Sequence, residues 1–110
     1  MIRKGNFMIR IAVLYPDSPG AKFDMAYYTS KHMPMVKSRC GADCKSIAAE
    51  RGVGGGEPGS KPPNLAIGYL TFDSLESFQK SFGPHAPEIM ADIANYTNIK
   101  PVIQISEVTL

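Results

Sequence analysis

Successive residues fall on two alternating faces, with a period of two, in three largely apolar segments: Phe7–Tyr15, Asn64–Phe72 and Pro101–Leu110. Such alternation is typical of β-strands. Lys45–Val53 predicts a weaker strand, because its alanines would equally suit a helix. Gly52–Pro63 is rich in glycine and proline, so a flexible hairpin connection is expected there.

A first helical region is predicted from Phe23 or Asp24 to about His32. Pro34 should disturb the helical geometry near its end, so a separate short turn or helix through Met35–Arg39 is expected to follow.

A second helical region begins after an N-cap at Asp73 or Ser74. Its apolar residues form one stripe at spacings of three and four: Leu75, Phe78 and Phe82. Gly83–Pro84 ends this helix, and Ala86–Ile93 predicts a further helical turn or two.

The predicted order is βαββαβ, which is the α+β, ferredoxin-like arrangement: a four-stranded antiparallel sheet with both helices on one face. The predicted strands carry apolar residues on both faces. An apolar sheet face without helices needs a cover. A homodimer that pairs the two sheet faces is therefore expected, which would form a dimeric α/β barrel.

The 110 residues carry a formal net charge of +2, and 44% of them are hydrophobic. These values predict one globular domain over residues 8–110, with residues 1–7 as an N-terminal extension. The start can be Met1 or Met8, and no secretory signal pattern precedes the first strand, so a cytoplasmic location is expected. The weak charge argues against a nucleic-acid partner, and no apolar run is long enough for a membrane helix.

Cys40 and Cys44 are four residues apart, which matches neither zinc-ligand spacing nor a Cys-x-x-Cys redox pair. We expect two free thiols beside a loop and no metal site. Gly52–Pro63 lacks the Gly-Lys-Ser/Thr of a phosphate loop, and no dinucleotide fingerprint follows a strand. No cofactor is therefore expected.

The residues best suited to catalysis are Asp24, Tyr28 and His32, which would form one polar stripe on a regular helix. His32 can move a proton near neutral pH. Tyr28 can orient it or donate a hydrogen bond to a substrate oxygen. The alternative is a solvated helix face on which His32 merely caps carbonyls.

Three further residues are candidates for substrate binding. His85 lies in a break between helical segments, where it is a second acid or base, a substrate contact or a cap of the next segment. Tyr15 and Tyr69 are expected in adjacent central strands, where their phenols either line one cavity or fill the core. Asp92 is interpreted as structural or solvated, and Phe78 and Met90 as packing residues.

Several segments together resemble the EthD family, which is named for ethyl tert-butyl ether degradation. The resemblance rests on Tyr15-Pro16, Phe23–Tyr28, His32–Val36 and the run from Ala91 through Val108. It implies a dimeric α/β barrel of two ferredoxin-like subunits. It also implies that the protein accompanies oxidative degradation systems, but it specifies neither a reaction nor a cofactor.

Three functional hypotheses follow from these residues. The first is a cofactor-independent oxidoreductase, isomerase or lyase for an apolar, oxygen-bearing organic compound, in which His32 moves a proton and Tyr28 and Tyr69 hold an oxygen. The second is a non-catalytic binding or accessory protein of an oxygenase system. The third is a structural dimer with a vestigial pocket.

Overall fold

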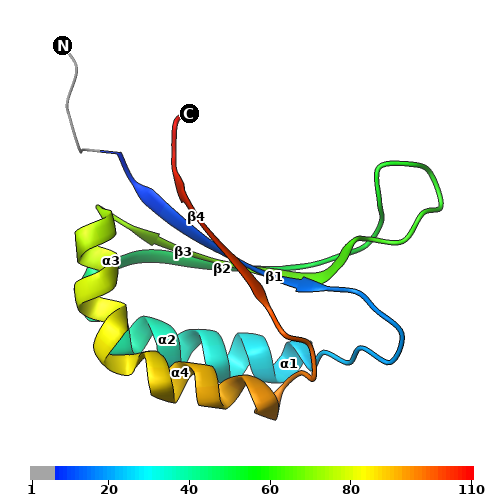
Figure 1. The fold of residues 1–110 in the computed structure, drawn as a ribbon, viewed down its shortest axis with the longest axis horizontal. Coiled ribbons are helices and arrows are strands. Elements are labelled where there is room, and N and C mark those ends of the chain that lie inside the picture. Colours follow the sequence, from blue (N-terminus) through cyan, green and yellow to red (C-terminus); the bar gives the residue numbers. More distant parts are fainter. Residues whose placement is uncertain (1–6) are drawn as a thin grey trace.

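The computed structural model describes residues 7–110, so residues 1–6 of the expected N-terminal extension lie outside the described part. Four strands form one antiparallel sheet in the order β2-β3-β1-β4. Their bounds are β1 Ile9–Pro16, β2 Cys44–Arg51, β3 Asn64–Phe72 and β4 Val102–Glu107. Helical segments follow β1 and β3, so the predicted α+β ferredoxin-like fold is confirmed (Figure 1).

The first helical region is continuous, and its geometry is disturbed just before Pro34, as the sequence indicates. It consists of α1 (Met25–Tyr27), a π-helical turn (Tyr28–His32) and α2 (Met33–Cys40). Pro34 has no N–H to donate, and the turn before it is widened: the Met33 N–H bonds to the Tyr28 carbonyl, five residues back. Proline therefore alters the helical period here without ending the helix.

The second helical region follows the prediction closely. The Ser74 side chain caps α3 (Leu75–Phe82) by accepting a hydrogen bond from the Ser77 N–H. A short 3₁₀ turn at Gly83–His85 leads into α4 (Ala86–Asp92), and a second 3₁₀ turn at Ile93–Asn95 leads toward β4. The Gly83-Pro84 pair thus separates α3 from α4, as the sequence indicates.

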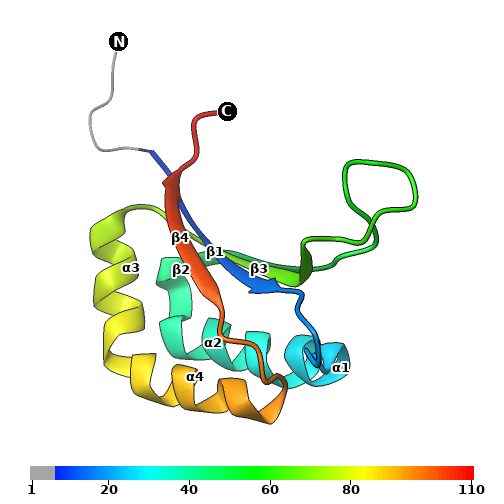
Figure 2. The same cartoon turned by 45° about the vertical axis from the view of Figure 1, so that its right-hand side comes forward.

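All helices lie on one face of the sheet, as both ribbon views show (Figures 1 and 2). Strand register places Ile11 beside Leu70 and Tyr15 beside Ala66 on this helix-covered face, where all four are buried. The opposite face carries Leu14, and its neighbour across the strands, Val102, is 55% exposed. The two-sided apolar pattern therefore corresponds to one buried face and one face that no helix covers.

Both cysteines are free, and they flank a short 3₁₀ turn, Gly41–Asp43. Cys40 ends α2 and Cys44 begins β2, and each is buried in the hydrophobic core. Burial raises the pKa of both thiols above the ordinary value of 9.0. They are therefore expected to be protonated packing residues.

Candidate functional site

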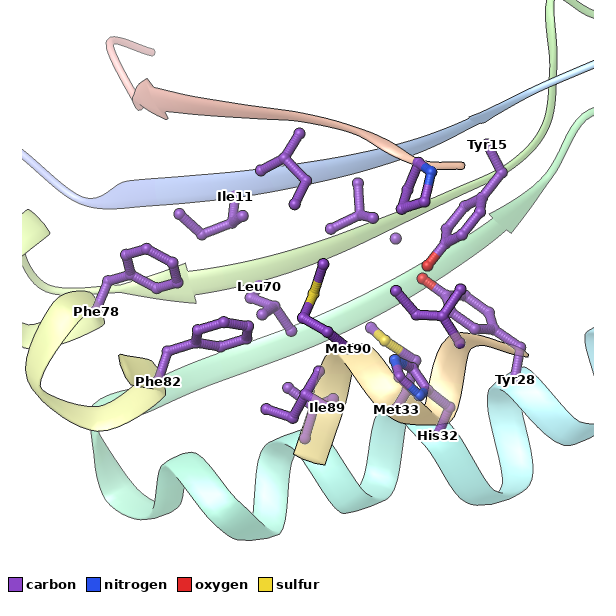
Figure 3. A pocket seen from close by; sticks show the side chains of 16 residues that line it. Ile11, Tyr15, Tyr28, His32, Met33, Leu70, Phe78, Phe82, Ile89 and Met90 are labelled. Carbon is purple, nitrogen blue, oxygen red and sulfur yellow. The ribbon is translucent and has the colours of Figure 1, made fainter. Parts of the chain in front are cut away.

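A cavity of about 70 Å³ lies between the helix-covered face of the sheet and the helices (Figure 3). The sheet contributes aliphatic side chains and a glycine, and the helices contribute two phenylalanines, two methionines and branched aliphatic residues. The lining residues are Ile11, Val13, Tyr15, Tyr28, His32, Met33, Val36, Gly68, Leu70, Phe78, Phe82, Ile89, Met90, Ile93, Pro101 and Ile103. Polar side-chain atoms in this set come only from Tyr15, Tyr28 and His32.

The mouth of the cavity lies between α4 and β4. Met90 on α4 and Ile103 on β4 both line the cavity, yet they are 44% and 47% exposed. Ile103 faces the helix layer, since it pairs with Val13 on that side of the sheet, but β4 is the edge strand. A ligand would therefore enter the cavity past the unbranched Met90 side chain and the edge strand β4.

The polar end of the cavity is built from aromatic rings. Tyr28 stacks on His32 with ring centroids 5.6 Å apart and planes 14° apart, and the Tyr96 ring lies 4.6 Å from His32. The Tyr15 and Tyr96 hydroxyls are hydrogen-bonded at 2.6 Å. Figure 3 shows the Tyr15 and Tyr28 hydroxyls pointing toward one another where sheet and helix meet.

Helical spacing brings these two rings together. Tyr28 and His32 are four residues apart, at the first and last positions of the π-helical turn. Residues four apart lie on the same side of a helix, about one turn from each other. The local backbone thus places both side chains toward the cavity.

His32 is 4% exposed and forms a short contact with a carboxylate from the other helical region. Its Nδ1 lies 2.8 Å from Asp92 Oδ2, across 60 residues of sequence. The other oxygen, Asp92 Oδ1, accepts hydrogen bonds from the Tyr27 hydroxyl at 2.7 Å and from Asn95 Nδ2 at 2.9 Å. Asp92 therefore has three partners, and one of them is the cavity histidine.

Burial and hydrogen bonding together set the protonation state of this pair at neutral pH. It lowers the pKa of His32 below the ordinary 6.5, and this outweighs the opposite effect of Asp92. Burial raises the pKa of Asp92, but the hydrogen bonds from Tyr27, Asn95 and His32 outweigh it and hold the pKa below the usual 3.8. The pair is therefore a neutral imidazole beside an ionised carboxylate.

The three phenols around His32 remain protonated. Burial raises the pKa of Tyr15, Tyr28 and Tyr96 far above the ordinary value of 10. Phenols in this state donate hydrogen bonds and do not act as bases. The polar end of the cavity therefore combines one neutral imidazole with hydroxyl donors.

Three of the residues predicted from sequence meet in this cavity, namely Tyr15, Tyr28 and His32. Asp24 does not join them: it is exposed and caps α1 by accepting a hydrogen bond from the Tyr27 N–H. The predicted stripe therefore loses its first member, because Asp24 precedes the helix instead of lying on its face.

The structure does not bring Tyr15 and Tyr69 to one cavity, which is one of the two arrangements that the sequence leaves open. Tyr69 pairs with Ala12 and lies on the helix-free face, where Arg10 stands 5.7 Å above its ring. His85 is half-buried in the turn between α3 and α4, and it does not line the cavity either. The strand register separates the two tyrosines, since successive residues point to opposite faces.

Sequence reasoning missed several residues of the site. Asp92 was interpreted as structural or solvated, and Phe78 and Met90 as packing residues, yet Asp92 binds His32 and the other two line the cavity. Tyr96 lies within the EthD-like segment but had no assigned role. Only the tertiary fold brings residue 92 to residue 32, so no local pattern could have identified this pair.

Two features of residues 7–110 bear on the kind of site present. Among residues 7–110, no three His, Cys, Asp or Glu side chains are grouped as a metal ion would require. Within the same residues, none of the helices has the length and apolar character needed to cross a membrane.

Comparisons with known proteins place this chain in a family. Residues 21–100 match the model of the EthD domain. An EthD-like protein from Ralstonia eutropha JMP134 is 46% identical, with a TM-score of 0.90, over 96% of this chain and 95% of that chain. No curated protein matches the chain.

More distant structures share the fold alone. An EthD family protein from Bacillus halodurans C-125 is 15% identical with a TM-score of 0.64, over 93% of this chain and 99% of that chain. A dimeric ferredoxin-like protein of unknown function from Thermobifida fusca YX is 16% identical with a TM-score of 0.52, over 98% and 96%. The match over residues 21–100 and the 46% identical relative show that this chain belongs to the EthD family.

Proposed function

We propose that the protein catalyses a cofactor-independent proton transfer on a small, apolar organic compound that carries an oxygen function. The observation that carries this proposal is the neutral His32 at one end of an otherwise apolar cavity, hydrogen-bonded to Asp92. A neutral imidazole in a dry site is suited to act as a general base.

The proposed step is removal of a proton from a carbon next to a carbonyl or similar group. His32 takes the proton, and the electron pair of the broken C–H bond moves onto the substrate oxygen to give an enolate. Hydroxyl donors from Tyr28 and Tyr15 stabilise that oxygen, in place of the pair Tyr28 and Tyr69 expected from sequence. Return of the proton to another atom completes an isomerisation, and loss of a leaving group completes a lyase reaction.

The size of the cavity restricts the substrate. An engineered apolar cavity of about 150 Å³ binds benzene, whereas this one encloses about 70 Å³. A substrate of aromatic-ring size therefore needs the mouth to widen, and the exposed Met90 side chain can move most readily. Compact, largely apolar molecules with one polar end fit this geometry best.

Incubation of the purified protein with phenolic, quinone-like and lactone compounds, without added cofactor and with a metal chelator, tests the proposal. We expect at least one compound to be converted with its mass unchanged or reduced by a leaving group. Calorimetric binding without conversion would support the alternative, a binding or accessory protein of an oxygenase system. Failure of every compound to bind at millimolar concentration would contradict both functions.

We also propose that the protein forms a homodimer through the helix-free face of the sheet. Leu14, Ile67, Tyr69 and Val102 all lie on this face, and Val102 is largely exposed. Removing such a surface from water favours association. The structurally similar protein from Thermobifida fusca is described as dimeric, which agrees with this proposal.

Light scattering at micromolar concentration should give about twice the 12.0 kDa chain mass. Val102→Lys would place a charge on the proposed interface and is expected to shift the population toward monomer. Val53→Lys, in the exposed loop between β2 and β3, is the control and should leave the mass unchanged. A wild-type monomer would contradict the dimer.

A further inference from the structure

The carboxylate of Asp92 lies at the boundary between the inner cavity and a polar groove on the outer side of the helices. Tyr27, Lys31, Glu88, Asp92 and Asn95 line this outer groove, whereas His32 lines the cavity. The Asp92 side chain is 17% exposed, against 5% for the His32 side chain. The hydrogen bond between them therefore joins an apolar interior to a solvated surface.

The hydrogen-bond partners of Asp92 determine which ring nitrogen of His32 carries the proton. An ionised carboxylate only accepts hydrogen bonds, so His32 Nδ1, at 2.8 Å, must donate. In a neutral imidazole the other nitrogen, Nε2, then has a free lone pair. The contact thus selects one of two tautomers.

The free nitrogen has open space beside it. Among residues 7–110, every side-chain nitrogen or oxygen that is sealed from solvent has a hydrogen-bond partner. Nε2 has no such partner in that part of the chain, so it is not sealed by protein. Because His32 borders the cavity and Asp92 occupies the Nδ1 edge, Nε2 opens toward the cavity.

Asp92 is itself held in place by a second layer of donors. The Tyr27 hydroxyl and Asn95 Nδ2 both bind Oδ1, which leaves Oδ2 to His32. Asn95 lies three residues after Asp92 on the same helical segment, and Tyr27 comes from α1. Two helical regions thus fix the carboxylate from both sides.

We propose that Asp92 is the positioning residue of this site: it holds His32 as the Nδ1–H tautomer with the Nε2 lone pair toward the cavity, and Tyr27 and Asn95 hold Asp92. The proposal rests on the proposed function for its catalytic meaning, since a base needs its lone pair on the substrate side. The tautomer itself is a property of the folded protein without substrate.

Nitrogen-15 NMR of the histidine rings at neutral pH tests the tautomer directly. The chain has two histidines, so His85 is the internal reference and His85→Asn completes the assignment. We expect the His32 Nδ1 signal to be that of a protonated nitrogen and Nε2 that of an unprotonated one. A proton on Nε2 in the wild type would overturn the proposal, whether or not a substrate is known.

The variant Asp92→Asn tests the cause of this preference. An asparagine can donate to Nδ1, so the tautomer population is expected to shift toward Nε2–H. Glu88→Gln is the matched control, because Glu88 lies one turn earlier on α4 and pairs with Arg39 instead of His32. An unchanged His32 tautomer in folded Asp92→Asn would refute the positioning role.

Two milder variants keep the test decisive if Asp92→Asn unfolds. Tyr27→Phe and Asn95→Ala each remove one donor to Oδ1 and leave the carboxylate in place. Each is expected to loosen Asp92 and to give a mixed tautomer population. If both variants keep the pure Nδ1–H form of His32, the proposed role of Tyr27 and Asn95 in holding Asp92 is wrong.

Kinetics on any converted compound separates positioning from binding. Asp92→Asn is expected to lower kcat by about 10²–10⁴-fold with KM changed little, as expected for a base held in the wrong tautomer. A raised KM with unchanged kcat would overturn the positioning role. If no compound is converted, the proposed function fails while the NMR result still decides the tautomer.

Discussion

Replacing His32 with asparagine is expected to lower kcat/KM by ~10²–10⁴-fold on a compound that the wild-type protein converts. Asparagine keeps an amide that can donate to Asp92, but it has no nitrogen that can accept the substrate proton. His85→Asn is the matched control, because His85 lies outside the cavity. Equal losses in both variants, or no loss in His32→Asn, would contradict a catalytic His32.

The pH dependence gives a second readout for the same residue. The buried His32 has its pKa below 6.5, so its neutral form is populated at neutral pH and the rate should fall only on the acid side of that value. The unfolded chain binds this proton more readily than the folded one. Stability should therefore also decrease as the pH falls below about 6.5, and His32→Asn should remove that part of the dependence.

The second large effect is expected at Gly68, where a change that usually stabilises a strand should do the opposite. Alanine in place of glycine within a strand ordinarily gains about 0.5–1 kcal/mol. At Gly68, however, an added Cβ would overlap the Tyr28 hydroxyl. We expect Gly68→Ala to destabilise the protein by roughly 1–3 kcal/mol, measured by urea unfolding.

A double-mutant cycle identifies the cause. Tyr28→Phe removes the oxygen that Cβ would meet, and the next atom, Cζ, is 3.1 Å away, which a small shift can accommodate. Gly68→Ala should therefore be less destabilising in the Tyr28→Phe background than in the wild type. Equal effects in both backgrounds would show that Gly68 does not provide space for Tyr28.

The fold could be predicted from sequence because its determinants are local. The alternation over Asn64–Phe72 matches β3 in both bounds, and Ser74 caps α3 as its side chain indicates. The weak strand over Lys45–Val53 is confirmed as β2. The disturbance expected at Pro34 takes the form of a π turn, since a proline near the start of a helical turn can be accommodated by widening the turn before it.

The site could be predicted only in part, for reasons of register and tertiary contact. Tyr15 and Tyr69 belong to neighbouring strands, but their pairing partners, Ala66 and Ala12, lie on opposite faces of the sheet. That difference of face depends on the register of the β1–β3 pairing, which the alternation of either strand alone does not specify. The contact between His32 and Asp92 requires two helical regions to pack together, and no local pattern encodes it.

The π-helical turn at Tyr28–His32 has a consequence for how the chain tolerates insertions and deletions. A π turn accommodates one residue more than an α turn, and each residue corresponds to about 100° of rotation around an α-helix. Deleting one exposed residue here, such as Thr29, would let the turn close to α geometry with little rotation of α1 relative to α2, because the deletion removes the extra residue that the wider turn accommodates. A one-residue gap in a related sequence would therefore mark a regular turn in place of the π turn, with Tyr28 and His32 three positions apart instead of four.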